Sequence, residues 1–254
     1  MAVRAIFPLA SLVLVAGALV FMFFVIFGGV YNHSPVNKFY LLEATTGNIP
    51  GAPTTSHWSY WNVCGTQNGL TVCDKTNAYS KIHPAFPLDP ASHRNFDTTQ
   101  NIPSDFVKHH AFYYYMTRFM FAFMLIALFF GAVALLTGLL ALCTRLGSYL
   151  SGLMTMIAAF FQAVNAALMT AAYVKGRNAF RSNGQSSQIG KYAFGFEWAA
   201  FACFFISMIL FCVGGAASRD KGASSGRRFG GRRNKSTRST KSRGSFVHDK
   251  EYGS

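Results

Sequence analysis

The chain has 254 residues, of which 51% are hydrophobic and 13% are charged. Because soluble globular domains carry about 25% charged residues, this composition excludes an ordinary water-soluble protein and favours a membrane protein. The net charge of +14 is unevenly placed, since eleven Lys and Arg but only three Asp and Glu follow residue 218.

Four stretches lack charged side chains and are long enough to cross a bilayer, which takes about 20 mostly apolar residues. In chain order they are Ala5–Tyr31, Phe119–Thr144, Leu146–Val174 and Trp198–Ser218. The alternative for the first stretch is a cleaved signal peptide, whose apolar run is shorter, about 7–15 residues. The sequence therefore predicts a membrane all-α four-helix bundle.

The distribution of Lys and Arg predicts the topology, because these residues stay on the cytosolic side when they flank a span. The basic end places the C-terminus in the cytosol, and four spans then place the N-terminus there as well. Four basic residues oppose this rule and suggest an anionic partner outside the cell: Lys175, Arg177, Arg181 and Lys191.

These observations divide the chain into eight predicted segments. They are a first helix with a short cytosolic N-terminus (1–31), an extracellular loop with a small sheet and a disulfide (32–111), a second helix (112–144), a cytosolic turn (145–148), a third helix (149–174), a basic extracellular loop (175–191), a fourth helix (192–218) and a disordered, polybasic cytosolic tail (219–254).

The large predicted loop, residues 32–111, is rich in Thr, Asn, Gly and Pro and has no helical apolar period. Short extended runs indicate a small antiparallel sheet, which needs a staple because two isolated strands are only marginally stable. Of the five cysteines, only Cys64 and Cys73 fall outside the cell, and the Asn68-Gly69 pair between them is a hairpin signal. We therefore expect a Cys64–Cys73 disulfide, with two free thiols as the alternative.

Two stretches of this loop carry a family resemblance. The first resembles the tryptophan–cysteine signature of the claudin superfamily and contains Trp58, Trp61, Asn62, Cys64 and Cys73. The second resembles the first-loop sequence of the fungal Sur-seven/PalI tetraspans and, between Phe39 and Ala52, contains Gly47 and Pro50. The resemblance implies a claudin-like fold, in which a left-handed four-helix bundle lies under an extracellular antiparallel sheet.

The same stretches leave two matters open. Trp58 and Trp61 suit either the bilayer interface or packing between the sheet and the helices. The claudin glycine and leucine before the tryptophan are replaced by Ser59 and Tyr60, which argues against a claudin-type paracellular barrier.

Polar residues inside the predicted spans are few. Gln162 and Asn165 share a helix face, where amides either bond neighbouring helices or line a pathway. Arg118 and Glu197 lie at similar depths, so we expect them to form an ion pair. The alternatives are that Arg118 bonds carbonyls of the sheet, as the resemblance to claudins implies, or that Glu197 pairs with Lys191. The sequence has no nucleophile elbow, P-loop, dinucleotide fingerprint or metal-ligand spacing, so we predict no enzyme activity, cofactor or metal.

The tail combines low complexity with clustered positive charge, as expected of a segment that binds anionic lipids of the inner leaflet. The alternative is a solvated tail that only obeys the topology rule. The basic residues concerned are Arg227, Arg228, Arg232, Arg233, Lys235, Arg238, Lys241 and Arg243. Cys143 and Cys212 lie near cytosolic helix ends, where they are either palmitoylation sites or buried thiols.

The resemblance and the residues together predict a structural protein of the fungal plasma membrane. It would organise an eisosome-type domain through self-association, eisosome proteins, the cell wall and anionic lipids, without nucleic acid, and would gather in cortical patches. The first alternative is a sensor or receptor subunit in ambient-pH signalling, as in the PalI branch. A channel or carrier is the second.

Overall fold

The computed structural model describes residues 2–73, 80–141 and 144–226. Residues 1–218 and 219–254 form separate units, and the following description concerns the first. Within the described ranges, four helices are long and apolar enough to cross a membrane. They are α1 (Ala2–Ile26), α3 (His110–Ala141), α4 (Arg145–Ser182) and α5 (Lys191–Gly226).

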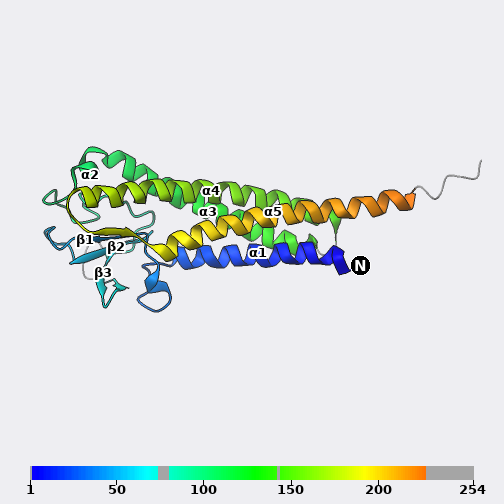
Figure 1. Ribbon diagram of the computed structural model, residues 1–254, viewed down its shortest axis with the longest axis horizontal. Helices are drawn as coiled ribbons and strands as arrows, with labels where there is room; N and C mark the ends of the chain where they lie inside the picture. Colours follow the sequence, from blue (N-terminus) through cyan, green and yellow to red (C-terminus); the bar gives the residue numbers. More distant parts are fainter. Residues whose placement is uncertain (1, 74–79, 142–143, 227–254) are drawn as a thin grey trace, which may run out of the picture. The chain divides into compact units, whose positions relative to one another are not determined.

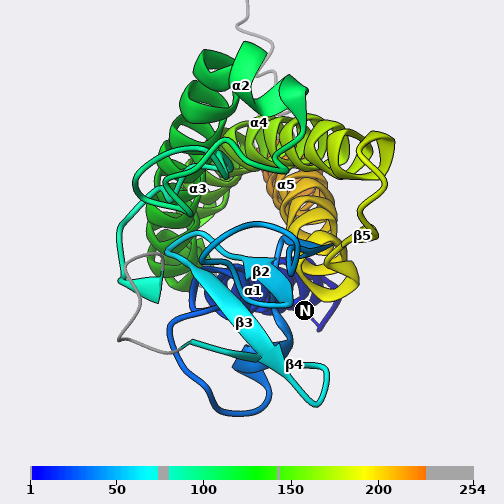
Figure 2. The same ribbon diagram turned by 90° about the vertical axis from the view of Figure 1, so that its left-hand side faces the viewer.

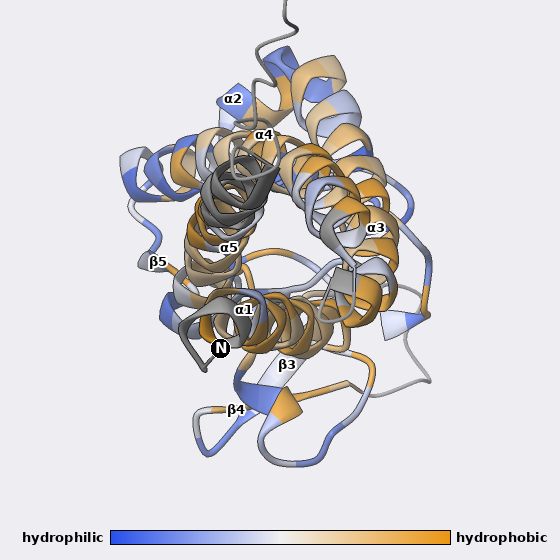
Figure 3. Ribbon diagram, turned by 90° about the vertical axis from the view of Figure 1, so that its right-hand side faces the viewer, coloured by the Kyte–Doolittle hydropathy of each residue, from blue (hydrophilic) through white to orange (hydrophobic). Residues whose placement is uncertain are grey.

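The four long helices form a ring in the order α1, α3, α4, α5, with α5 returning to α1 (Figure 2). Glycines allow close approach: a Cβ at Gly131 of α3 would lie 2.8 Å from the ring of Phe204 on α5. Ser207 of α5 donates a hydrogen bond to the carbonyl of Ser11 on α1 at 2.8 Å. Figure 3 shows hydrophobic residues along the helices, while hydrophilic ones gather on α2 and in the loops around the strands.

A five-stranded antiparallel sheet lies at one end of the bundle, which we call the sheet end (Figure 1). Its order is β4-β3-β2-β1-β5, and the strands are β1 (Leu42–Thr45), β2 (Thr55–Trp58), β3 (Val63–Gln67), β4 (Leu70–Val72) and β5 (Ser187–Ile189). Asn68 and Gly69 connect β3 to β4 with positive φ angles of 52° and 73°, as a type I′ turn requires. Two short helices, η1 (Val36–Lys38) and α2 (Ser104–Lys108), complete this end.

The predicted loop at 175–191 differs from the structure. Helix α4 continues beyond Val174 to Ser182, and the rest of the segment contributes β5 to the sheet. The helix continues because its last turns pack on protein: Gly176 lies against Leu88, and Phe180 is fully buried beside Trp58. The sequence predicts a helix end at Val174 because charged residues follow it. The backbone can nevertheless remain helical beyond that point wherever packing supports it.

Candidate functional site at the junction of the sheet and the bundle

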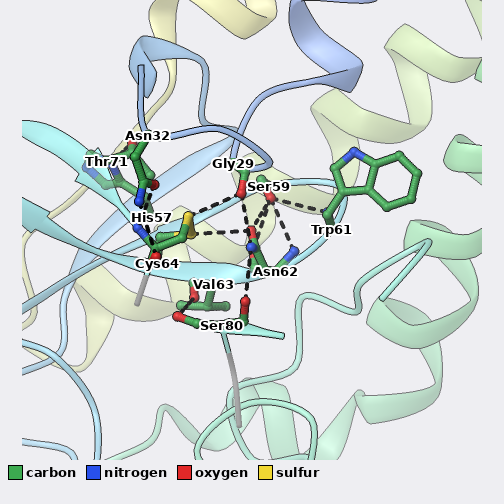
Figure 4. The surroundings of a disulfide bond; sticks show 11 residues. Gly29, Asn32, His57, Ser59, Trp61, Asn62, Val63, Cys64, Thr71 and Ser80 are labelled. Carbon is green, nitrogen blue, oxygen red and sulfur yellow. Dashed lines mark hydrogen bonds between the residues drawn. A yellow bond between two sulfur atoms is a disulfide. The ribbon is translucent and has the colours of Figure 1, made fainter. Parts of the chain in front are cut away.

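The predicted disulfide between Cys64 and Cys73 is confirmed, with the two Cα atoms 4.5 Å apart. Figure 4 shows its surroundings at the end of α1. Asn32, which follows α1, pairs with the backbone of Cys73 in both directions: its Nδ2 donates to the Cys73 carbonyl at 3.3 Å, and its Oδ1 accepts from the Cys73 N–H at 3.0 Å. The stapled hairpin is therefore anchored directly to the segment that follows the first helix.

Asn62, a residue of the family signature, makes the second connection between the hairpin and α1. Its Nδ2 donates to the carbonyls of Gly29 at 3.0 Å and Ser80 at 3.3 Å, while its Oδ1 accepts from the Ser59 hydroxyl at 2.8 Å. Gly29 has φ +80°, and a Cβ there would lie 2.4 Å from Ser59 Oγ. Glycine is required at this position because of both the backbone conformation and the close approach.

The two signature tryptophans pack inside the junction. Trp58 is fully buried, its ring lies 5.5 Å from that of Phe180 on α4, and its Nε1 donates to Asn95 Oδ1 at 3.1 Å. Trp61 donates to the carbonyl of Ile26 at the end of α1 and sets its ring edge-on to Phe121 of α3. Of the two roles considered for Trp58, packing between sheet and helices is the one that the structure shows.

Gly47 and Pro50 lie in the connection between β1 and β2. The Gly47 N–H donates to the carbonyl of Thr54 at 3.1 Å, and a Cβ on Gly47 would come within 3.3 Å of the Thr54 Cα. Pro50 is exposed. Gly47 thus fits the tight start of this turn, whereas Pro50 lies on its exposed surface.

Glu197 of α5 is the centre of the buried cluster, which we define as Tyr60, Gln162, Asn165 and Glu197. All four side chains are buried. Asn165 donates to Glu197 Oε2 at 2.9 Å, and Gln162 donates to the same oxygen and, at 3.2 Å, to the Glu197 backbone carbonyl. Tyr60, from the loop between β2 and β3, donates to Glu197 Oε1 at 3.3 Å. The cluster therefore joins α4, α5 and the sheet end.

The predicted ion pair between Arg118 and Glu197 is wrong. In the part of the chain that the structure describes, Arg118 has its guanidinium carbon 4.1 Å from the ring centroid of Tyr114 and makes no contact with an acidic side chain. Neutral amide and hydroxyl donors satisfy both carboxylate oxygens of Glu197, so it needs neither Arg118 nor Lys191. Equal depth along two helices is not enough for pairing, because the side chains also have to face one another.

A row of side-chain hydrogen bonds crosses the sheet, and we call Thr71, His57, Glu43 and Gln188 the cross-sheet row. Glu43 accepts from Gln188 of β5 at 2.8 Å and from Nε2 of His57 at 2.8 Å. The other ring nitrogen, Nδ1, then accepts from the Thr71 hydroxyl at 2.7 Å. The ring of Tyr40 stacks on that of His57, with centroids 3.8 Å apart.

Burial shifts the acid–base properties of this row. Burial lowers the pKa of His57, although Glu43 opposes the shift. Burial raises the pKa of Glu43, but hydrogen bonds from Gln188 and His57 outweigh it, so the net direction is down. Burial, helped by Glu43, raises the pKa of Tyr40 to about 12. Near neutral pH the row therefore contains a neutral imidazole beside a carboxylate.

The contacts of Tyr60 and of the cross-sheet row are not predictable from the sequence, because the partners lie far apart in the chain and no local pattern indicates them. Cys212 is an exposed free cysteine. Cys143 lies outside the described part of the chain, and so do the eight basic positions of the tail. These eight positions are Arg227, Arg228, Arg232, Arg233, Lys235, Arg238, Lys241 and Arg243.

Comparisons with known proteins agree with this architecture. The model of the SUR7/PalI family matches residues 7–210. Protein SUR7 of Candida albicans is 38% identical over 214 residues, which cover 83% of this chain and 75% of that protein. Protein SUR7 of Saccharomyces cerevisiae is 32% identical over 209 residues, covering 81% and 67%. A further S. cerevisiae protein, named as an uncharacterised plasma membrane protein, is 31% identical over 191 residues, covering 74% and 61%.

Proposed function

Because the chain belongs to the SUR7/PalI family, whose fold is claudin-like, we propose that it is a structural tetraspan that organises an eisosome-type domain of the plasma membrane. It does so by lateral assembly with copies of itself and with eisosome proteins. The plasma membrane is also the location given in the name of one relative. The same proposal has the sheet facing the cell exterior and the wall, and both termini in the cytosol.

The observation that carries this proposal is the firm connection between the sheet and the helices. Asn32 and Asn62 tie the stapled hairpin to the end of α1, while Tyr60 reaches from the sheet end to Glu197 between α4 and α5. A sheet held in this way presents a fixed surface to neighbours. That property suits a scaffold, whereas a carrier needs parts that move relative to one another.

The proposed orientation has two supports. A disulfide forms and persists in an oxidising compartment, which favours an exterior position for the Cys64–Cys73 hairpin. The clustered Lys and Arg after residue 226 favour a cytosolic C-terminus. There the tail would bind anionic lipids, with about 1 kcal/mol of attraction for each basic residue near the surface.

Imaging of the full-length chain with a C-terminal fluorescent tag in living yeast cells tests the proposal. We expect stationary cortical patches whose fluorescence recovers slowly after bleaching. A variant with the eight basic tail residues changed to Gln should reach the cell surface but form fewer patches. Uniform, rapidly recovering surface fluorescence of the unmodified chain would contradict domain organisation.

A second candidate, a sensor of ambient pH as in the PalI branch, is favoured by the cross-sheet row. Acidification would protonate His57 and disturb the hydrogen bonds that connect β4, β2, β1 and β5. The same imaged cells separate the two functions. A sensor predicts that His57→Gln abolishes the transcriptional response to ambient pH while the patches persist, and a scaffold predicts that patch formation itself depends on the chain.

A further inference from the structure

Arg118 lies within α3, the second long helix, and no acidic side chain of the described residues forms an ion pair with it. The residue is half-buried, and its Nε is buried without a hydrogen-bond partner. In the described ranges its one recorded interaction is the placement of the guanidinium over the ring of Tyr114. A charged side chain in a span is costly unless it finds an anion, a polar partner or water. Arg118 therefore has donors to offer to a ligand from outside the protein.

The position of Tyr114 defines where the guanidinium lies. Tyr114 precedes Arg118 by one helical turn, toward the sheet end, so the side chain of Arg118 extends from the span toward that membrane surface. The candidate membrane span in α3 has 31 residues, so its length is about 46 Å at 1.5 Å per residue. This length exceeds the roughly 30 Å thickness of the hydrocarbon core. The excess places the first turns of α3 at headgroup depth.

Exposed tyrosines at the sheet end agree with this depth. Tyr31, Tyr115 and Tyr192 are each more than half exposed, with 55%, 58% and 57% of their surface accessible. Tyrosine side chains that project from spans collect at the membrane–water interface, where the ring is in apolar surroundings and the hydroxyl is hydrated. Tyr115 adjoins Tyr114 in the helix, so the guanidinium of Arg118 lies at the level of this aromatic belt.

The groups around Arg118 favour an anionic ligand. His110 packs against Tyr114, with ring centroids 5.9 Å apart, so that His110, Tyr114 and Arg118 form a stripe along α3. Asp89, the acid nearest to this stripe, is bonded to His110, and Glu197 is bonded within the buried cluster. Lipid phosphates are the abundant anions at headgroup depth, and a planar guanidinium donates to two phosphate oxygens at once.

We propose that Arg118, supported by Tyr114, binds the phosphate group of a phospholipid in the leaflet at the sheet end. The lipid headgroup lies along the stripe, and its acyl chains run beside α3. This site is independent of the basic tail, from which it differs in kind: it is a single position on a helix of the bundle rather than a diffuse cluster of charge.

Native mass spectrometry of the purified full-length chain in neutral detergent tests the site. The probe is phosphatidylcholine, and diacylglycerol with the same acyl chains serves as the lipid without phosphate. The variants are Arg118→Met, Arg118→Lys and Arg177→Met. Arg177 is the matched control, because it lies at the same end of the bundle and its guanidinium bonds the exposed side chain of Asn178. All variants keep the tail, so its contribution to lipid binding is constant.

We expect Arg118→Met to weaken the tightest phosphatidylcholine binding by about tenfold, the loss of one charge-assisted contact, and Arg118→Lys to restore part of it. Arg177→Met should bind like the unmodified chain, and diacylglycerol should not distinguish the variants. Inorganic phosphate at millimolar concentration should not displace the lipid, which shows that the ligand is membrane-anchored. Equal phosphatidylcholine binding by Arg118→Met and Arg177→Met, with circular dichroism showing both folded, would overturn the proposal.

Discussion

Glu197 and Arg118 are the two charged residues that the sequence places inside spans, and they differ in burial and in hydrogen-bond partners. Glu197 is fully buried and receives hydrogen bonds from one helix, α4, and from one loop. Arg118 is half-buried, and within the described residues its guanidinium contacts the ring of Tyr114 and has no acidic partner. Hydrogen-bond donors of the protein itself satisfy the Glu197 carboxylate, whereas the Arg118 guanidinium is available to groups outside the protein.

The difference shows how one fold can use polar groups for two purposes. A satisfied cluster in the interior contributes to the assembly of helices, because its donors and acceptors have no other partners once they are removed from water. An unsatisfied charge at the surface contributes little to assembly and can recognise a ligand. The following predictions, from the largest expected effect to the smallest, test this distinction.

Replacement of Glu197 by Leu should have the largest effect on stability. It removes the acceptor from the amides of Gln162 and Asn165 and from the hydroxyl of Tyr60, and each unsatisfied buried group costs about 1–3 kcal/mol. We expect the melting temperature in detergent to fall by on the order of 10 °C. Glu197→Gln, which keeps one acceptor oxygen, is the control and should lose less than half as much. A Leu variant as stable as the Gln variant would show that the cluster does not hold the helices.

Asn62→Ala should have the next largest effect, because Asn62 connects the hairpin to α1 through Gly29 and also bonds Ser59 and Ser80. Three lost side-chain hydrogen bonds predict a destabilisation of about 2–3 kcal/mol. Thermal unfolding in detergent measures it. Asn178→Ala is the matched control, since Asn178 is exposed and bonds only the neighbouring Arg177 in the described structure. Equal melting temperatures of the two variants would mean that the hairpin is held chiefly by its disulfide.

Acidification should have a smaller effect, through His57. Its pKa is lower in the folded protein than in the unfolded chain, so the unfolded state binds the proton more readily and stability falls as pH drops below about 6.5. Glu43, whose pKa is also lowered, adds a further loss only at more acidic pH, below about 4.5. Melting temperatures between pH 7.5 and 5.5 should therefore decline less in His57→Gln than in the unmodified chain.

The control for this titration is His93→Gln, because the His93 side chain is 93% exposed. It should retain the pH dependence of the unmodified chain. If His57→Gln and His93→Gln declined with equal slopes, the acid sensitivity would arise elsewhere, and the argument for a sensor based on the cross-sheet row would fail.

The sequence predicts the parts of this structure that depend on composition and local spacing. Four apolar runs predict the four spans, and the compartment and spacing of Cys64 and Cys73 predict their disulfide. Tyr60 could not be predicted as a partner of Glu197, because 137 positions separate them and the contact depends on how the sheet seats on the helices. Likewise, a rise of 1.5 Å per residue gives the depth of Arg118 and Glu197 but not the direction in which each faces.

Arg118→Met should have the smallest effect on stability, and its combination with Glu197→Gln tests the comparison most directly. In neutral detergent, Arg118 contributes one contact with Tyr114, worth about 0.5–1 kcal/mol, so a shift of about 1–4 °C is expected. Because the two residues share no partner, their losses in the double variant should add within about 0.5 kcal/mol. Phosphatidylcholine should widen the gap in melting temperature between Arg118→Met and the unmodified chain, since a ligand that binds only the folded state stabilises it. A coupling energy above 1 kcal/mol would instead reveal a direct interaction between Arg118 and Glu197, and the two residues would then form a single charge pair rather than two separate sites.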